Sequence, residues 1–551
     1  MKETNEKLPS KLLKGAALLS LAAIITKLLG MLQKIPLQNI GGDSVFGIYN
    51  TVYPFYTLLI TLTTSGFQAA IAKFVAERHA EGRFLKQREV LQTGILIMSM
   101  LGVAGCLILY LGAPLLAGVI GSSQLIPALR AAAPALLFFP ISAALRGYFQ
   151  GLQDMASTAV SQVLEQTVRV TVMIVLLLYF SRIQSADRVI AGGALAGSSV
   201  GAAGGLIVML LYWRVYLSRE KRKGSEAERD TVSERDGHGA VANLRKPRAE
   251  LLSAMLKYAI PICVASLAVP LISLVDTFTL PRLLSGHGEE LRIMEQVGVY
   301  NRGIPLVQLV TAIASSLSVL FIPAMAELNI QGDTTMIRKQ SLLALRWFWL
   351  IGLAASLGLA LLAEPINIML YQDAEGTSTM GWIAWTAAPT ALIAVTSALL
   401  QGLGSVRAPA VHLLVAALLK TALNAALVPQ LGITGAAIAG VAAYTAAAAL
   451  NLALLLRRVG SRPRLRDALL RPAAAALAMA AAVLALRLAA AELPAGRAIA
   501  AAESLLGVLL GAAVFAAAVL RTRLLSEAEL AALPRVGPKL LAWLRKLRLL
   551  P

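Results

Sequence analysis

The chain has 551 residues, of which 57% are hydrophobic and only 15% are charged, and its formal net charge is +20 at pH 7. A soluble chain of this size would need a far more polar surface, so the composition excludes an ordinary soluble protein. Many runs reach the roughly 20 apolar residues with which a helix crosses a bilayer, whereas a β-barrel would show short alternating segments. The sequence therefore predicts an all-α integral membrane protein.

No pattern in the sequence indicates catalysis or a bound metal. Cys106 and Cys263 lie far apart in apolar stretches, and the four histidines are scattered. Zinc-ligand spacing, a phosphate-binding loop and a dinucleotide fingerprint are all absent from the sequence. We therefore expect no enzyme, no catalytic residue, no metal ligands and no cofactor. An ATP-driven pump would require a separate motor subunit.

We predict about fourteen membrane-spanning helices. In chain order they cover approximately residues 12–37, 47–75, 89–111, 127–149, 156–180, 189–214, 251–281, 298–326, 341–363, 380–402, 408–428, 433–456, 467–489 and 499–520. The first run is too long for a cleavable signal peptide, and no small-residue cleavage site follows it. It is therefore expected to remain as the first helix.

The loops between these spans differ in charge, and the difference predicts their orientation. Lys and Arg gather in alternate loops such as ERHAEGRFLKQRE and RRVGSRPRLR, while LGAPLLAGVIGSSQ has none and EPINIMLYQDAEG is acidic. Basic loops face the cytoplasm, so both termini are expected to be cytoplasmic. The net charge of the chain is then explained without nucleic acid, and anionic lipid adds a further partner.

An internal repeat divides the chain into two halves. GIYN at 47–50 is echoed by GVYN at 298–301, and QGL at 150–152 recurs at 401–403, both with an offset of 251 residues. Each copy has six spans, an even number, so both copies have the same orientation in the membrane. This predicts two six-helix bundles related by an axis along the membrane normal, as in transporters that bind substrate near the midplane.

These observations predict five parts of the chain. They are an N-terminal lobe at 1–214, a polar and flexible cytoplasmic linker at 215–250, a C-terminal lobe at 251–457, two additional transmembrane helices within 458–522, and a basic amphipathic cytoplasmic tail at 523–551.

Charged side chains inside the predicted spans are the main functional signal. A charge at the bilayer centre costs about 2.5–3.5 kcal/mol on insertion scales, so each needs a partner or water. In SQVLEQTVRV, Glu165 precedes Arg169 by one helical turn, and we expect the two to pair. Lys27, Arg169 and Lys420 lie roughly 18–22 Å along their helices, near mid-bilayer. The repeat offset places Arg169 on Lys420.

The remaining intramembrane charges are mostly basic. Few acidic residues neighbour Lys27, Lys34, Arg302 or Lys420 in the sequence, and Asp276 is the main remaining acid. We expect these cations to face a water-filled cavity that binds an anion, because Arg and Lys hold phosphates well. The candidate substrate-binding residues are Lys27, Lys34, Arg169, Arg302, Lys420 and Gln68, and the candidate coupling or ion-pair residues are Glu165 and Asp276.

Several other polar residues have a simpler interpretation. Lys73 and Arg146, near cytoplasmic ends of spans, are expected to extend toward the membrane surface. Tyr49, Tyr53 and Tyr56 form a stripe that fits either an interfacial aromatic belt, which we favour, or sugar stacking.

Four stretches together resemble one family of bacterial polysaccharide exporters. LRGYFQGLQDMASTAVSQVLEQTVRV, TKLLG at 26–30, GIYNTVYPFYTLLITLTTSGFQAAIAKFVAE and GVYNRGIPLVQLV are similar to segments of the stage V sporulation protein B / YtgP family. The resemblance implies the two-lobe MATE fold of the multidrug/oligosaccharidyl-lipid/polysaccharide exporter (MOP) superfamily, and it extends more distantly to MurJ-type lipid II flippases. Those flippases carry cavity arginines, and Lys27 and Arg302 match two of the positions. TLTT at 61–64 has no cation where the family has one.

The resemblance implies an exporter of undecaprenyl-diphosphate-linked sugars in the bacterial cytoplasmic membrane. Lipid II is the leading candidate substrate, and a vegetative or a sporulation role stays open. The expected partners are the anionic lipid-linked sugar and membrane lipid, with a monomeric protein. Export would be driven by the membrane potential or by Na⁺ or H⁺. The alternatives are a cation-coupled multidrug antiporter on the same fold and a non-transporting scaffold for cell-wall synthesis.

Overall fold

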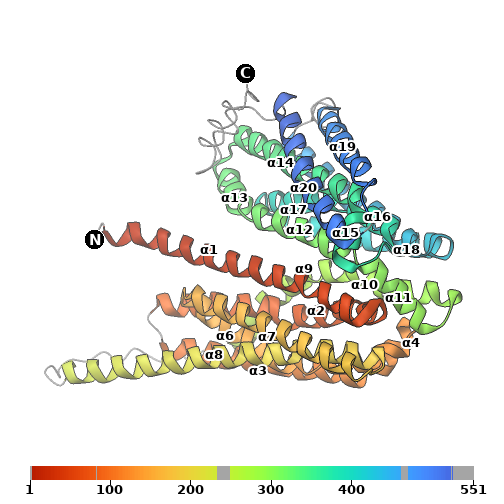
Figure 1. The fold of residues 1–551 in the computed structure, drawn as a ribbon. Helices are drawn as coiled ribbons and strands as arrows, with labels where there is room; N and C mark the ends of the chain where they lie inside the picture. The colour runs from red at the N-terminus through yellow and green to blue at the C-terminus, as the bar shows by residue number, and fades with distance from the viewer. Residues whose placement is uncertain are drawn as a thin grey trace. The chain divides into compact units, whose positions relative to one another are not determined.

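The computed structural model describes residues 3–81, 84–231, 248–460, 470–494, 496–522 and 524. Over these residues the chain is built from helices without a β-strand, which confirms the all-α class (Figure 1). The predicted linker lies partly, and the predicted tail almost wholly, outside the described residues. Within the linker range, the chain is helical as far as Thr231 and again from Arg248.

Two compact units divide the chain, and each is described by itself. The first unit comprises Met1–Pro281 and Gly288–Glu295, and the second comprises Arg282–His287 and Gln296–Pro551. The elements that begin in the first unit are α1 (Glu3–Leu32), α2 (Lys34–Ala80), α3 (Phe84–Leu111), α4 (Ala113–Ile120), η1 (Ser123–Leu125), α5 (Ile126–Ala132), α6 (Ala135–Gly151), α7 (Met155–Arg182), α8 (Asp187–Thr231), α9 (Arg248–Ser266), α10 (Ala268–Leu284) and α11 (Glu290–Asn301).

The remaining elements lie in the second unit. They are η2 (Ser285–His287), α12 (Ile304–Ser318), α13 (Phe321–Gln331), α14 (Thr334–Leu361), α15 (Ala363–Tyr371), α16 (Thr377–Ala384), α17 (Ala387–Gly402), α18 (Arg407–Val459), α19 (Arg471–Ala490) and α20 (Arg497–Arg521).

Eleven stretches of the described chain are long and apolar enough to cross a membrane. Two of them, Leu18–Ala80 and Arg407–Val459, each cover two predicted spans. Both contain a kink at a glycine with positive φ, 78° at Gly42 and 58° at Gly432, a conformation that costs glycine little. The predicted span 251–281 falls on α9 and α10, which are not among the eleven. The chain is therefore a multi-pass membrane protein, and the number fourteen stays a prediction.

The helix α9, and α10 as far as Pro281, belong to the first compact unit. Tight packing of α9 on α2 accounts for this. Gly66 of α2 lies directly against the backbone carbonyl of Ala259, and the Cys263 thiol donates a hydrogen bond to the Leu62 carbonyl at 3.4 Å. The division between the compact units therefore falls near residue 282, and the predicted lobes and the linker at 215–250 stay predictions.

The internal repeat is confirmed by the bounds of the helices. The helices α3, α4, α5 and α6 recur as α14, α15, α16 and α17, displaced by 250 to 252 residues. The turns recur as well, because the left-handed residue after α4, Gly121, corresponds to Gln372 after α15. Likewise, Gln153 after α6 corresponds to Gly404 after α17. The two halves therefore share one backbone framework, including its unusual backbone conformations.

The helices α19 and α20 lie outside the repeat and pack on α14 and α15. Leu350, Leu362, Met479 and Phe515 contribute to their shared apolar core. Arg487 of α19 donates to the carbonyl of Leu361 at 3.0 Å and forms ion pairs with the two carboxylates Glu364 and Glu503. Arg497 of α20 donates to the carbonyl of Met369 at 2.9 Å. Two arginines thus fasten the terminal helix pair to both ends of α15.

The contact between α2 and α9 can be tested at Gly66. A β-carbon at this position would overlap the Ala259 carbonyl, so we expect Gly66→Ala to lower the free energy of unfolding by about 1–3 kcal/mol. Gly118→Ala in α4 is the matched control, because nothing lies within 4 Å of its new β-carbon. Thermal unfolding in detergent would measure both variants. Equal midpoints for the two would contradict the packing.

Candidate functional site

A buried ion pair joins α6 and α7 in the first unit. Nη2 of Arg146 lies 2.6 Å from Oε2 of Glu165, and the two side chains are 3% and 9% exposed. Arg146 also donates to Oγ of Ser161 at 2.7 and 3.1 Å, and Ser161 donates to the Gly205 carbonyl at 3.2 Å. The Arg146 charge is therefore satisfied inside the protein.

Two predictions about these charges were wrong. Glu165 pairs with Arg146 and not with Arg169, and Arg146 does not extend toward the membrane surface. The reason is the short turn between α6 and α7, which places Arg146 beside Ser161 and Glu165 on the facing helix. The register of that helical hairpin, read outward from the QGL turn, is the signal that could have identified this pair.

Glycines on α8 allow α7 to approach closely enough for this arrangement. A β-carbon at Gly205 would lie 2.7 Å from Oε2 of Glu165 and 3.2 Å from Nη2 of Arg146. A β-carbon at Gly201 would lie 2.7 Å from Cβ of Arg169. Small residues at four-residue spacing are a common way to bring two membrane helices into contact. The same helix face thus positions both charged residues of α7.

Arg169 is buried among neutral oxygen atoms. Its Nη2 donates to Oη of Tyr56 at 2.6 Å and its Nη1 to Oε1 of Gln166 at 3.4 Å. Its side chain also lies over the Tyr56 ring, 5.4 Å from the centroid. The guanidinium stays protonated in proteins, so this site carries a positive charge. Among the described residues no carboxylate lies within ion-pair distance of it.

The tyrosine stripe lines the same region. The rings of Tyr49 and Tyr53 are stacked, with centroids 5.8 Å apart, and Tyr53 lies 6.0 Å from Tyr56. Tyr49 and Tyr56 are each only 1% exposed, and Gln33 donates to Oη of Tyr49 at 3.2 Å. An interfacial belt would leave such rings at the surface, so that interpretation was wrong for these two. We refer to Gln33, Tyr49, Tyr53, Tyr56 and Arg169 as the Arg169 cluster.

Some buried donor and acceptor atoms in and beside the Arg169 cluster form no hydrogen bond with described residues. Within the described part of the chain, Nε of Arg169 and Oε1 of Gln33 are buried without a hydrogen-bond partner. Lys34, the residue after Gln33, is 8% exposed, and no described carboxylate forms an ion pair with it. This region therefore combines two buried positive charges with unused donor and acceptor atoms.

The other first-unit candidates are less enclosed. Lys27 is exposed on α1, and none of the described carboxylates forms an ion pair with it. Gln68 on α2 and Asp276 on α10 are partly buried. The binding roles assigned to Lys27, Lys34, Arg169 and Gln68, and the coupling role of Asp276, stay predictions.

Arg302 in the second unit has an acidic partner, so the expectation of an uncompensated cation was wrong there. Its Nη1 and Nη2 lie 2.5 and 3.0 Å from the two carboxylate oxygens of Asp373, and Nη1 also donates to the Glu375 carbonyl at 3.3 Å. Tyr371 donates to the Arg302 carbonyl at 3.0 Å. The partner stands 71 residues later in the chain, in the loop after α15. Arg302 is only 1% exposed.

Lys420, on α18, occupies the position equivalent to Arg169. It is buried, and its Nζ lies 5.9 Å from the centroid of the Tyr444 ring. The cation–π contact therefore recurs, although the ring comes from a different helix of the repeat.

The second unit has a different set of polar side chains where the first unit has its buried ion pair. Ser397 and His412 stand at the positions equivalent to Arg146 and Ser161. Asn451 joins them, donating to Oγ of Ser397 at 3.2 Å and lying 2.6 Å from Nδ1 of His412 through its Oδ1.

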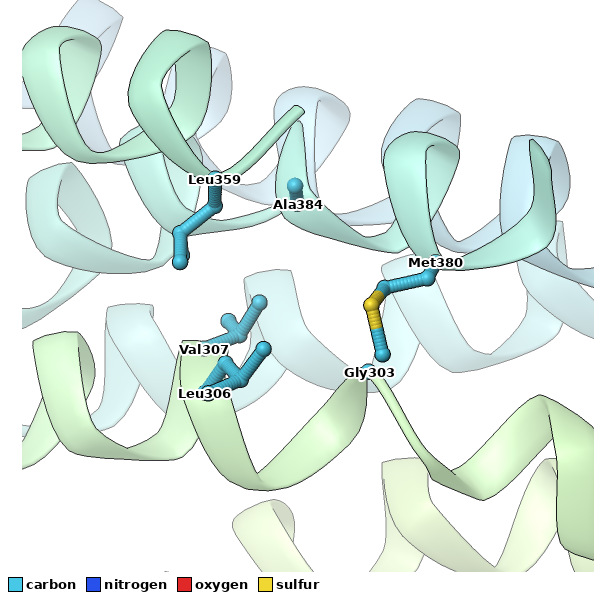
Figure 2. Close-up of a pocket in the computed structure, with 6 residues that line it drawn as sticks. All are labelled: Gly303, Leu306, Val307, Leu359, Met380 and Ala384. Atoms are coloured by element: carbon cyan, nitrogen blue, oxygen red, sulfur yellow. The ribbon is translucent and has the colours of Figure 1, made fainter. Parts of the chain in front are cut away.

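An apolar pocket lies beside Arg302 (Figure 2). Gly303, Leu306, Val307, Leu359, Met380 and Ala384 line it, and the gap between them is too small to hold a water molecule. Its lining side chains carry no charge and no hydrogen-bonding group, so this pocket does not suit a phosphate or a sugar.

The packing of α8 against the ion pair can be tested at Gly205. We expect Gly205→Ala to push Glu165 away from Arg146 and to lower the free energy of unfolding by about 1–3 kcal/mol. Gly204→Ala is the control, since its new β-carbon would meet Val168 at an ordinary 3.4 Å. Urea or thermal unfolding would compare them. The interpretation fails if Gly204→Ala costs as much as Gly205→Ala.

The Asp373 carboxyl predicts a pH effect. Partial burial raises its pKa, but hydrogen bonds from Arg302 and the Glu375 amide outweigh this, so the net pKa lies below its ordinary value. Its contribution to stability is therefore complete above the unfolded pKa, about 3.9, and is lost as the pH falls through the folded pKa. We expect wild type to exceed Asp373→Asn in unfolding midpoint by a constant margin above pH 5. A margin unchanged down to the lowest pH at which the chain stays folded would contradict this.

Comparisons with known proteins identify the family of this chain. The family described as polysaccharide biosynthesis protein matches residues 12–329. The uncharacterized membrane protein YabM of Bacillus subtilis (strain 168) is 34% identical over 97% of this chain and 96% of its own length. The lipid II flippase MurJ of the same organism is 28% identical over 82% of this chain and 84% of its own length. The stage V sporulation protein B of Bacillus subtilis (strain 168) is 27% identical over 78% of this chain and 80% of its own length.

Solved structures show the same fold at low sequence identity. A structure of the lipid II flippase MurJ in an inward closed conformation covers 92% of this chain and 99% of its own, with a TM-score of 0.64 and 13% identity. A structure of an inward-facing multidrug resistance MATE family transporter of the MOP superfamily covers 79% of this chain and 94% of its own, with a TM-score of 0.62 and 15% identity. The family match extends over more than half of the chain, and the architecture is that of these solved structures. The chain therefore belongs to the polysaccharide biosynthesis protein family and has the MATE fold.

Proposed function

We propose that this protein is a flippase for an undecaprenyl-diphosphate-linked cell-wall precursor, lipid II or a related lipid-linked oligosaccharide. It would carry the precursor from the inner to the outer leaflet of the bacterial cytoplasmic membrane by alternating access, with both termini in the cytoplasm. The observation that supports this most is the set of first-unit cations, Lys27, Lys34 and Arg169, that lack a described carboxylate partner. The relatives named as lipid II flippase and sporulation protein support the same substrate class.

The charge of the first unit suits a diphosphate. An uncompensated cation in a membrane is stable only next to water or an anion, and the first unit holds several. Arg169 has an unused Nε–H, and a phosphate oxygen is a strong acceptor for it. Arg302 is bound to Asp373 in this conformation, so its predicted contact with substrate would require phosphate to replace that carboxylate.

Export of an anion is electrically favourable in a cell with a negative interior. Moving one charge across the membrane changes the free energy by about 2.3 kcal/mol per 100 mV, so a diphosphate gains several kcal/mol on the outward step. We propose the membrane potential as the driving force, without an organic cofactor. If Na⁺ or H⁺ is coupled instead, the candidate carboxylates are Asp276 and Glu165, of which Glu165 forms an ion pair with Arg146. We expect a monomer that contacts membrane lipid and binds no nucleic acid.

A cation-coupled multidrug antiporter is the alternative, since MATE transporters share the fold. Such a protein attracts a cationic drug through membrane carboxylates. The intramembrane carboxylate of α7, Glu165, forms an ion pair with Arg146. The cations Lys27, Lys34 and Arg169 would repel the drug. The distribution of charge therefore favours the anionic lipid.

The test is complementation of a strain depleted of its lipid II flippase, followed by flipping assays in proteoliposomes. We expect wild type to rescue growth, whereas Lys27→Gln and Lys34→Gln each lower the flipping rate about tenfold or more, the usual effect of losing a charge-assisted contact. Lys73→Gln is the control, because it also removes a lysine from this unit but one that is exposed and paired with Glu77.

Two outcomes would count against the proposal. Rescue by Lys27→Gln and Lys34→Gln at the wild-type rate would remove these cations from substrate binding. Failure of wild type to flip any undecaprenyl-diphosphate-linked sugar, while it exports a cationic dye, would favour the antiporter.

A further inference from the structure

Glu165 stands one helical turn before Arg169 on α7, where an ion pair between the two would be expected. Side chains four residues apart on a helix have β-carbons about 5–6 Å from each other. Both residues are buried, each with 7% of its surface exposed. Within the described chain, the Glu165 carboxylate is hydrogen-bonded through Oε2 alone, and Nε of Arg169 has no acceptor. The two residues therefore have the spare oxygen atom and the spare donor that an ion pair would need.

The guanidinium of Arg146 on α6 holds Glu165 instead. Nη2 of Arg146 lies 2.6 Å from Oε2 of Glu165. Arg146 is itself oriented by Ser161, whose Oγ accepts from Nε at 3.1 Å and from Nη2 at 2.7 Å. Ser161 is fixed in turn, because it donates to the Gly205 carbonyl at 3.2 Å. Hydrogen bonds between charged groups are stronger than those between neutral ones, so this network binds Glu165 firmly.

Arg169 is left with neutral partners, which do not cancel its charge. The Tyr56 hydroxyl and the Gln166 side-chain carbonyl accept from its guanidinium at 2.6 and 3.4 Å. Arg146, Glu165 and Arg169 together carry one net positive charge. If Arg146 were neutral, the remaining carboxylate and guanidinium would carry none. The positive charge at Arg169 therefore depends on a residue of another helix.

The second repeat keeps the cation without the carboxylate. Under the offset of 251 residues, the equivalents of Arg146, Glu165 and Arg169 are Ser397, Ala416 and Lys420. The acid and the arginine that binds it are both absent from this copy, and the net charge of the three positions is again one positive charge. A carboxylate beside the cation thus occurs together with a second arginine, as expected if that arginine serves to neutralise the carboxylate.

We propose that Arg146 is a positioning residue of the anion site: by binding Glu165, it keeps the charge of Arg169 available to the diphosphate of the substrate. Without Arg146, the buried carboxylate would turn to Arg169, because a buried charge that loses its partner is strongly destabilised. Here the ligand of Arg169 is taken to be an anion, so the inference rests on the proposed function and deepens it.

A structure of the full-length Arg146→Gln variant in lipid nanodiscs tests the first step. We expect the Glu165 carboxylate to lie within ion-pair distance of the Arg169 guanidinium, whereas in wild type, determined in the same way, it stays with Arg146. A carboxylate that remains apart from Arg169 in the variant would overturn the proposal. This measurement is independent of the proposed function, because it does not depend on what the protein transports.

Binding of undecaprenyl diphosphate to the full chain in nanodiscs tests the second step. We expect Arg146→Gln to raise the Kd about tenfold, the usual effect of losing a charge-assisted contact. The double variant Arg146→Gln/Glu165→Gln should return the Kd close to the wild-type value, because Arg169 then has no carboxylate beside it. An ion pair that only holds helices together predicts no such recovery.

Matched variants separate this effect from a general loss of charge or stability. Arg88→Gln also removes an arginine from an ion pair of this unit, since Nη2 of Arg88 lies 2.6 Å from Oε2 of Glu220, and we expect it to leave the Kd unchanged. Arg146→Lys keeps the charge and should recover most of the affinity. In an Arg169→Gln background, Arg146→Gln should add little, because its effect passes through Arg169.

The double variant is decisive even if Arg146→Gln does not fold. Weak binding by Arg146→Gln/Glu165→Gln would overturn the proposal, because Arg146 would then matter apart from Glu165. Affinity close to that of wild type would support it. If wild type does not bind undecaprenyl diphosphate at all, the proposed function fails, and the structure of Arg146→Gln still decides whether Arg146 keeps Glu165 from Arg169.

Discussion

The electrostatic cost of placing a charge in hydrocarbon determines how this molecule is assembled. Each charged side chain within the spans must find a counter-charge, a set of neutral dipoles or water. The structure uses the first solution for Arg146 with Glu165 and the second for Arg169 with Tyr56. The close helix packing at Gly201 and Gly205 follows from it, because a carboxylate and a guanidinium interact well only at short range.

The same constraint explains why the two repeats share a framework but differ in chemistry. Their helices and left-handed turns coincide under one offset, so the backbone is common to both. The polar interior diverges, with an ion pair and Ser161 in the first repeat and Ser397, His412 and Asn451 in the second. A cation facing a tyrosine ring is retained in both. Conservation of the backbone with divergence of the buried charges leaves the first repeat as the more cationic interior.

Sequence reasoning predicted the class and the repeat, because hydropathy and periodicity depend on local composition. It failed wherever a partner came from another helix. Glu165 was assigned to Arg169, one turn away, because the sequence alone shows only which residues are close along the chain. Arg146 precedes Glu165 by 19 residues and lies on another helix. Asp373 was visible only as part of the acidic loop EPINIMLYQDAEG, and nothing local connected that loop to Arg302.

The attachment of the terminal helix pair makes the two repeats mechanically unequal. Arg487 and Arg497 fasten α19 and α20 to α15, whose following loop holds Arg302. In the described chain, α4 has no such brace, although it is the counterpart of α15. One of the two repeat copies is therefore braced by additional helices, and the other is not. We expect thermal motion to be larger in the unbraced copy, which also carries the surplus of positive charge.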